Sequence, residues 1–80
     1  MNKNIIIIEI TKKELTHYCV NDYWDMIAFI ESIAKKHNIK VNSYDADKEN
    51  YLIECKVDEA DKLSIELEKI DVNHKLYYGD

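Results

Sequence analysis

The chain has 80 residues, which is enough for one small domain with a marginal hydrophobic core. Its net charge is −5, and all 11 basic residues are lysines, which excludes recognition of phosphate or guanine by guanidinium groups. The single glycine, Gly79, excludes a glycine-rich phosphate loop, and no apolar run is long enough for a transmembrane span or signal peptide. We therefore expect one cytoplasmic α+β domain, residues 1–80, that binds neither nucleic acid nor membrane directly.

The first half of the chain predicts a strand followed by a helix. Residues 4–11 are β-branched and apolar on both faces, which is typical of a buried central strand. Residues 22–37 place their apolar side chains on one helical stripe, with Asp22 as the N-cap and Asp25 in the first turn. The connection between them, residues 11–21, fits a loop, a short helix that starts at a capping-box pattern, or the first part of one long helix.

The second half predicts a hairpin, a helix and a last strand. Residues 39–45 and 51–57 flank the polar sequence DADKEN and are expected to pair as a hairpin. Residues 58–70 form an amphipathic helix that Asp58 is expected to cap. Residues 72–78 alternate again and end the domain as a strand.

The predicted order of elements is therefore β-α-β-β-α-β. Under the neighbour and handedness rules, this order folds most naturally as a ferredoxin-like sandwich. The prediction is a four-stranded antiparallel sheet with two helices on one face, in which the first and third strands are central.

Each possible catalytic or metal-binding group in the sequence also has a simpler structural explanation. His17 and Cys19 fit a thiol nucleophile with a base, and with Cys55 and His74 they would supply four zinc ligands, but no tight ligand pair is present. Cys55 and His74 also fall on the core-facing side of their strands, where a cysteine acts as a small hydrophobic residue. We predict no catalytic residue, no metal site and no cofactor.

The acidic turn DADKEN resembles the start of a calcium loop. Asp45, Asp47 and Glu49 alternate, but the loop lacks the glycine and the distant bidentate glutamate that a calcium loop uses. A solvated hairpin turn is the favoured interpretation.

The charge distribution indicates where a partner would bind. Residues 1–44 carry six lysines against five acidic residues, whereas residues 45–71 carry ten acidic residues against four lysines. Phosphate-binding domains have the opposite sign, so the acidic segment favours a protein partner with a basic surface. The residues expected to contact it are Trp24, Glu59, Asp61, Ile65, Glu66 and Glu68. Trp24 lies off the apolar stripe of its helix, so it either packs under residues 11–21 or is an exposed contact anchor.

The sheet face away from the helices is the second candidate surface. RNA-recognition modules of this topology carry stacking aromatics on the central strands, whereas aliphatic residues and glutamates occupy these positions here. An aliphatic patch of this extent suggests a homodimer or protein contact. The residues expected to form it are Ile5, Ile7, Tyr44, Leu52 and Tyr77.

The sequence favours two functions over the others. The first is a small acidic, non-catalytic inhibitor or immunity-type protein that binds a basic surface of a target, including targets that themselves bind nucleic acid. The alternative is a dimeric regulatory domain that binds a small metabolite at its interface, which rests on fold-level analogy. A small enzyme is the third hypothesis. It ranks last because only His17, Cys19 and the nearby aspartates could form its active site.

Overall fold

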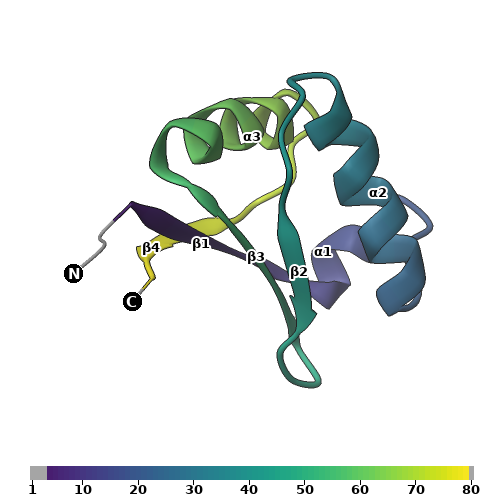
Figure 1. The fold of residues 1–80 in the computed structure, drawn as a ribbon. Coiled ribbons are helices and arrows are strands. Elements are labelled where there is room, and N and C mark those ends of the chain that lie inside the picture. The colour runs from purple at the N-terminus through teal and green to yellow at the C-terminus, as the bar shows by residue number, and fades with distance from the viewer. Residues whose placement is uncertain (1–3, 80) are drawn as a thin grey trace.

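The computed structural model describes residues 4–79 and shows an α+β fold built on a four-stranded antiparallel sheet (Figure 1). The elements are β1 (Ile5–Thr11), α1 (Lys12–Thr16), α2 (Tyr23–Lys35), β2 (Asn42–Asp45), β3 (Asn50–Lys56), α3 (Val57–Lys69) and β4 (Lys75–Tyr78). The strand order is β2-β3-β1-β4, and every neighbouring pair is antiparallel. The prediction that the first and third strands are central is confirmed.

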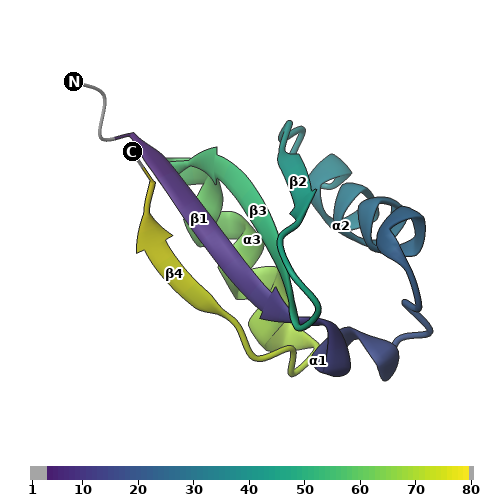
Figure 2. The same ribbon diagram turned by 90° about the horizontal axis from the view of Figure 1, so that it is seen from below.

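The isoleucine run of β1 is buried on one face only. Ile6, Ile8 and Ile10 are buried in the core, whereas Ile5 and Ile7 alternate with them and are half-buried. In Figure 2, β4, β1 and β3 lie in front of α3, and α2 lies beside β2. The sequence predicts that both faces of this strand are buried, and that prediction is wrong. The strand is central, but helices cover only one side of the sheet, so only that face of β1 is fully buried.

The connection after β1 contains a third helix, which corrects the expectation of two. The Thr11 hydroxyl caps α1 by accepting a hydrogen bond from the Glu14 N–H (3.2 Å). The chain then leaves the helical conformation, and Asp22 starts α2 by accepting from the Asp25 N–H (2.8 Å). Residues 11–21 thus form a short helix and a loop, and the interpretation as one long helix is wrong.

Several predicted boundaries differ from the structure. Helix α3 begins at Val57, one residue earlier than expected, so Asp58 lies in the first turn and is not the cap. The Glu59 carboxylate instead accepts a hydrogen bond from the Lys56 N–H (3.4 Å). Strands β2 and β4 are only four residues each, because residues 39–41 and 72–74 do not pair within the sheet.

All three helices end in the same way, although no glycine follows any of them. Cys19, Asn38 and Asp71 have positive φ angles of 62°, 57° and 59°. The next residue in each case is buried and donates its N–H back to the last turn of the helix. These bonds join Val20 to Leu15 (3.2 Å), Ile39 to Ala34 (3.0 Å) and Val72 to Leu67 (2.9 Å). This is the Schellman arrangement, in which the left-handed residue turns the chain and an apolar residue seals the helix end.

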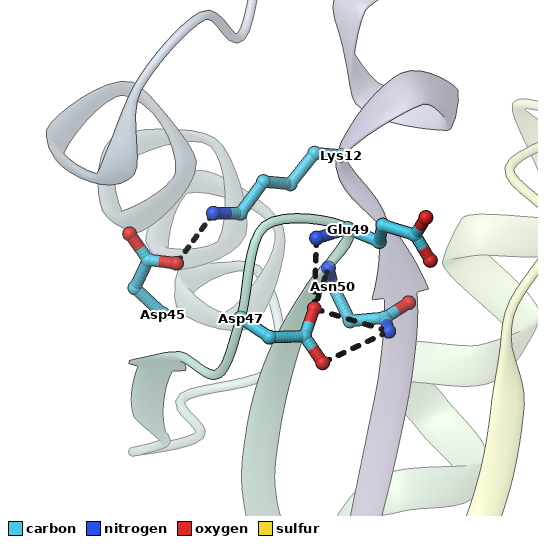
Figure 3. Close-up of polar contacts among 5 residues, drawn as sticks. All are labelled: Lys12, Asp45, Asp47, Glu49 and Asn50. Carbon is cyan, nitrogen blue, oxygen red and sulfur yellow. Dashed lines mark hydrogen bonds and ion pairs between the residues drawn. The ribbon is translucent and has the colours of Figure 1, made fainter.

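The turn between β2 and β3 uses its acidic side chains for local structure (Figure 3). The Asp47 carboxylate accepts hydrogen bonds from the N–H groups of Glu49 (2.7 Å) and Asn50 (2.8 Å). These bonds lower the pKa of Asp47, and the bond from Glu49 has the largest effect. Asp45 pairs with the Lys12 ammonium (2.5 Å), and the Glu49 side chain points away from both aspartates. The alternating carboxylates therefore do not converge on a common point.

One hydrophobic cluster joins the sheet to the helices. Its largest fully buried side chains are Ile8, Ile10, Leu15, Met26, Ile30, Ile53, Leu67 and Val72. The predicted helical stripes are confirmed, because the buried residues of α2 and α3 fall on them. Among residues 4–79, no helix combines the length and the apolar character that a membrane crossing requires.

Candidate protein-interaction surface between α3 and β4

The acidic residues predicted to contact a partner lie on two different flanks of α3. Asp61 lines a hollow together with Leu76 and Tyr78 of β4. Ile65 and Glu68 follow Asp61 at helical spacings of four and three residues, so they continue the same side of α3. Glu59 and Glu66 lie on the other flank, toward α2. The five residues of α3 that the sequence predicts as partner contacts therefore lie on two sides of the helix.

The β4 flank of α3 carries several exposed apolar side chains. Ile65 is 52% exposed, Leu76 46% and Tyr78 74%, and Val57 at the start of the helix is also exposed. Leu76 pairs with Ile8 and Tyr78 with Ile6, so both project from the helix-bearing side of the sheet. Helix α3 does not extend over this edge. We call Val57, Asp61, Ile65, Glu68, Leu76 and Tyr78 the α3–β4 surface.

Two hollows run along this surface. One, of about 230 Å³, lies between the first half of α3 and β4, and the second lies beside the loop that follows α3. Their described lining residues include the acids Asp61, Glu68 and Asp71 and no lysine. The surface therefore combines exposed apolar area with acidic side chains.

A serine and a histidine meet beside the second hollow. The His74 Nδ1–H donates to the Val72 carbonyl (2.8 Å), which leaves Nε2 to accept from the Ser64 hydroxyl (2.6 Å). The backbone N–H of Ser64 belongs to the hydrogen-bond ladder in the middle of α3, so it cannot stabilise an oxyanion. The pair therefore fixes the loop after α3 to the helix. The expectation that His74 lies within a strand is wrong, since β4 starts one residue later.

Glu66 holds two parts of the structure together. Its carboxylate lies 3.0 Å from His37 Nε2, 3.6 Å from the Lys69 ammonium and 4.0 Å from that of Lys36. The hydrogen bond to His37 is the main reason why the pKa of Glu66 is lowered, although partial burial opposes it. Glu66 thus connects α3 to the end of α2, and we leave it out of the α3–β4 surface.

Trp24 is exposed but lies far from this surface. Its side chain is 74% exposed, and its ring lies 5.5 Å from that of Tyr23 in an edge-on arrangement. Of the two interpretations of Trp24, the exposed one holds. Helix α2 and β4 lie on opposite sides of the molecule in Figures 1 and 2, so Trp24 and Leu76 belong to separate faces.

The sheet face without helices is of mixed character. Ile5, Ile7 and Leu52 are half-buried, and Tyr44 and Tyr77 are exposed. The Tyr77 hydroxyl donates to Glu9 Oε1 (2.7 Å), and this bond raises the pKa of Tyr77. The structure thus places the five predicted residues together, with glutamates among them.

The thiols are free and in contrasting environments. Cys19 is exposed, whereas Cys55 is buried, as expected for the core-facing side of its strand. Burial, and then the charges of Glu59, Asp58 and Glu54, raise the pKa of the Cys55 thiol to about 11. Within residues 4–79, no three side chains of His, Cys, Asp or Glu come together as metal ligands would.

Comparisons of the chain with models of protein families, with curated proteins and with solved structures find no match.

Val57, Leu76 and Tyr78 were not among the surface residues predicted from the sequence. The available signal was the alternation of Leu76 and Tyr78 with Tyr77 in the last strand, together with an acidic helix just before it. The contact between Ser64 and His74 was also not predicted, and it depends on how the loop after α3 folds back.

Proposed function

We propose that this protein is a small, non-catalytic inhibitor or immunity-type protein that binds a basic surface of a target protein. The single observation that carries the proposal is the α3–β4 surface, where Ile65, Leu76 and Tyr78 are exposed beside Asp61 and Glu68. Apolar side chains supply contact area, and the acids select a partner that carries lysines or arginines.

The distribution of charge supports this assignment over a merely solvated helix. The lysine in the middle of α3, Lys62, lies outside both hollows, and the strand residue Lys75 pairs with Glu9 and so projects from the other face of the sheet. The two hollows beside Leu76 and Tyr78 are therefore lined by acids and, among the described residues, by no lysine. A solvated helix face needs no exposed apolar cluster beside it.

The proposal of a non-catalytic role rests on the geometry of the reactive side chains. Cys55 is buried with a raised pKa, which disfavours the thiolate that a nucleophile requires. Ser64 is hydrogen-bonded to His74 but has no oxyanion donor from its own helical backbone. The free thiols of Cys19 and Cys55 also support a reducing, cytoplasmic location.

For the fold we infer a ferredoxin-like sandwich with one added helix. The central position of β1, which pairs with β3 on one side and β4 on the other, supports this assignment. Helix α1 departs from the simple pattern, and with the loop of residues 17–22 it lengthens the connection to α2.

The test is affinity capture of the tagged protein's partner from a lysate of its source cells, with mass spectrometry of the retained proteins. The double variant Asp61→Lys/Glu68→Lys reverses the charge of the α3–β4 surface. The matched control, Glu31→Lys/Glu49→Lys, makes the same change in net charge on exposed residues elsewhere. We expect one dominant basic partner at low salt, lost at high salt and in the first variant, and retained by the control.

Retention by both variants would overturn the role of the α3–β4 surface. A stable homodimer that retains no partner would instead favour the alternative, a regulatory domain that binds a metabolite through its open sheet face. A thermal-shift screen against metabolites would then identify the ligand.

A further inference from the structure

We propose that β4 receives an extended segment of the target as a fifth strand of the sheet, and that this segment carries both apolar residues and lysine or arginine on the face that it turns toward α3. This inference rests on the function proposed above and names the mode of recognition and the chemical class of the partner.

The backbone of β4 presents free hydrogen-bonding groups at its outer edge. The Gly79 N–H donates to the Ile5 carbonyl (2.9 Å), which fixes the phase of the β1–β4 ladder. Residues that bond to one neighbour alternate along an antiparallel strand with residues whose N–H and C=O point away from it. Leu76 and Tyr78 therefore direct these groups outward, where an added strand would bind.

The opposite edge of the sheet is protected. The Tyr23 hydroxyl of α2 donates to the Ser43 carbonyl of β2 (2.7 Å), and the Lys12 ammonium pairs with Asp45 at the end of that strand. A helix and an ion pair thus cover the β2 edge, as is usual for strands at the border of a sheet. Among the elements that the structure describes, β4 has no such cover, and all four of its residues are exposed.

The side chains around β4 specify the chemistry of the added strand. On the helix side, Leu76 and Tyr78 would pack against its apolar residues. Asp61 and Glu68 lie beside them, within reach of long basic side chains from the same segment. A second copy of this chain fits less well, because it would bring two acidic surfaces of a molecule with net charge −5 together.

The test uses a displayed library of random peptides of about ten residues, long enough to cover one strand. The library is panned on the protein at low salt, and the strongest binder is then synthesised. We expect selected peptides that are rich in β-branched residues, carry lysine or arginine two or four residues away from an apolar residue, and lack proline. By NMR, the peptide should slow hydrogen exchange of the Leu76 and Tyr78 amides at least tenfold, and leave unchanged that of Ser43, whose N–H points outward from the β2 edge.

Two protein variants isolate the backbone contribution. The protein made by chemical ligation with N-methyl-leucine at position 76 loses the outward N–H and keeps the side chain, whereas Leu76→Ala keeps the N–H. We expect the first to reduce peptide affinity at least tenfold and the second to reduce it less. Unchanged binding by the N-methyl protein, failure to select any peptide, or unchanged exchange at Leu76 and Tyr78 would overturn strand addition.

The outcomes separate this inference from the proposed function. If the charge-reversed protein loses its cellular partner but the β4 amides are unaffected by any ligand, the α3–β4 surface binds by side chains alone. If capture of the partner is also unaffected, both proposals fail. A dimer that protects the Leu76 amide without peptide would show that a second copy is the occupant and would contradict the basic partner.

Discussion

At the scale of single residues, the acidic side chains of α3 have different roles. Glu66 is engaged with His37 and two lysines, whereas Asp61 and Glu68 face the hollows beside β4. The difference follows from their positions around α3 and not from their chemistry. The two kinds of acid can therefore be distinguished by substitution.

We predict that Glu66→Gln destabilises the protein at neutral pH and that this effect disappears in acid. The folded-state pKa of Glu66 lies below its ordinary value, so its ion pairs add stability above the unfolded-state pKa. That stability is lost as the pH falls through the folded-state pKa. Urea unfolding of both proteins between neutral and acidic pH measures the difference.

The control for this prediction is Glu68→Gln, which changes an exposed acid of the same helix. It should leave the pH dependence of unfolding close to that of the natural protein. A Glu66→Gln difference that stays constant down to strongly acidic pH would contradict the role given to the carboxylate.

The two thiols should differ sharply in reactivity. At pH 8 iodoacetamide is expected to alkylate exposed Cys19 and spare Cys55, which is buried and has its pKa raised to about 11. Mass spectrometry of peptides counts the modified sites, and both cysteines should react in denaturant. Rapid labelling of Cys55 in the folded protein would mean that β3 opens readily.

At the scale of elements, the shared helix ending compensates for a sequence nearly without glycine. Cys19, Asn38 and Asp71 each hold a left-handed conformation that favours glycine. The buried Val20, Ile39 and Val72 that follow them keep the chain in this conformation through apolar contacts. Packing thus compensates for local backbone strain.

Replacing these residues by glycine should stabilise the protein. We expect Cys19→Gly and Asp71→Gly each to raise the free energy of unfolding by about 0.5–1 kcal/mol, because glycine adopts a positive φ without steric cost. Asn38→Gly should gain less, since asparagine tolerates this conformation. Urea titration measures all three.

The matched control for the glycine series is Ala28→Gly in the exposed face of α2, which should lose about 1 kcal/mol. A loss of stability in Cys19→Gly or Asp71→Gly would show that the replaced side chain contributes more than its strain costs.

At the scale of the whole molecule, the segment between β1 and α2 is fastened to the opposite end of the chain. The Tyr18 hydroxyl donates to the Ile70 carbonyl, and the Glu14 carboxylate accepts from the Asn73 N–H (3.2 Å). The Ile70 carbonyl and the Asn73 N–H both lie in the segment between α3 and β4. These two bonds therefore join the segment before β4 to α1 and its following turn.

Loss of the Tyr18 contact should loosen that loop. Tyr18→Phe keeps the ring beside Phe29 (5.6 Å between ring centres) and removes the hydroxyl, so we expect a loss of about 1 kcal/mol in unfolding free energy. Hydrogen exchange of the Asn73 amide should become faster. Exchange that is unchanged there would show that Glu14 alone holds the loop.

Local features of the fold could be predicted because neighbouring residues determine them. The Asp22 cap, the helix at Thr11 and the acidic turn before β3 follow from side chains that bond within a few residues. The start of α3 was misplaced because Lys56, which does not resemble a cap, precedes it. The ends of β2 and β4 were misplaced because strand length depends on pairing with distant segments.

The candidate site could be predicted only in part. The sequence shows its acidic residues as a cluster of negative charge, and it shows Ile65 as an apolar residue that lies off the apolar stripe of its helix. Leu76 and Tyr78 could not be predicted, because their exposure depends on how far α3 extends over the edge of the sheet. The separation of Asp61 from Glu66 likewise required knowing where β4 and α2 lie.

The sequence by itself determined the α+β class, the central place of β1, the apolar stripes of α2 and α3 and the acidic character of the second half. These follow from periodicity and composition, which depend on local geometry and on which side chains water solvates. Only the tertiary structure decided which edge of the sheet is open, which acids are free and where apolar side chains meet them. Those properties arise from contacts between segments far apart in the chain, and short-range patterns do not encode which segments meet.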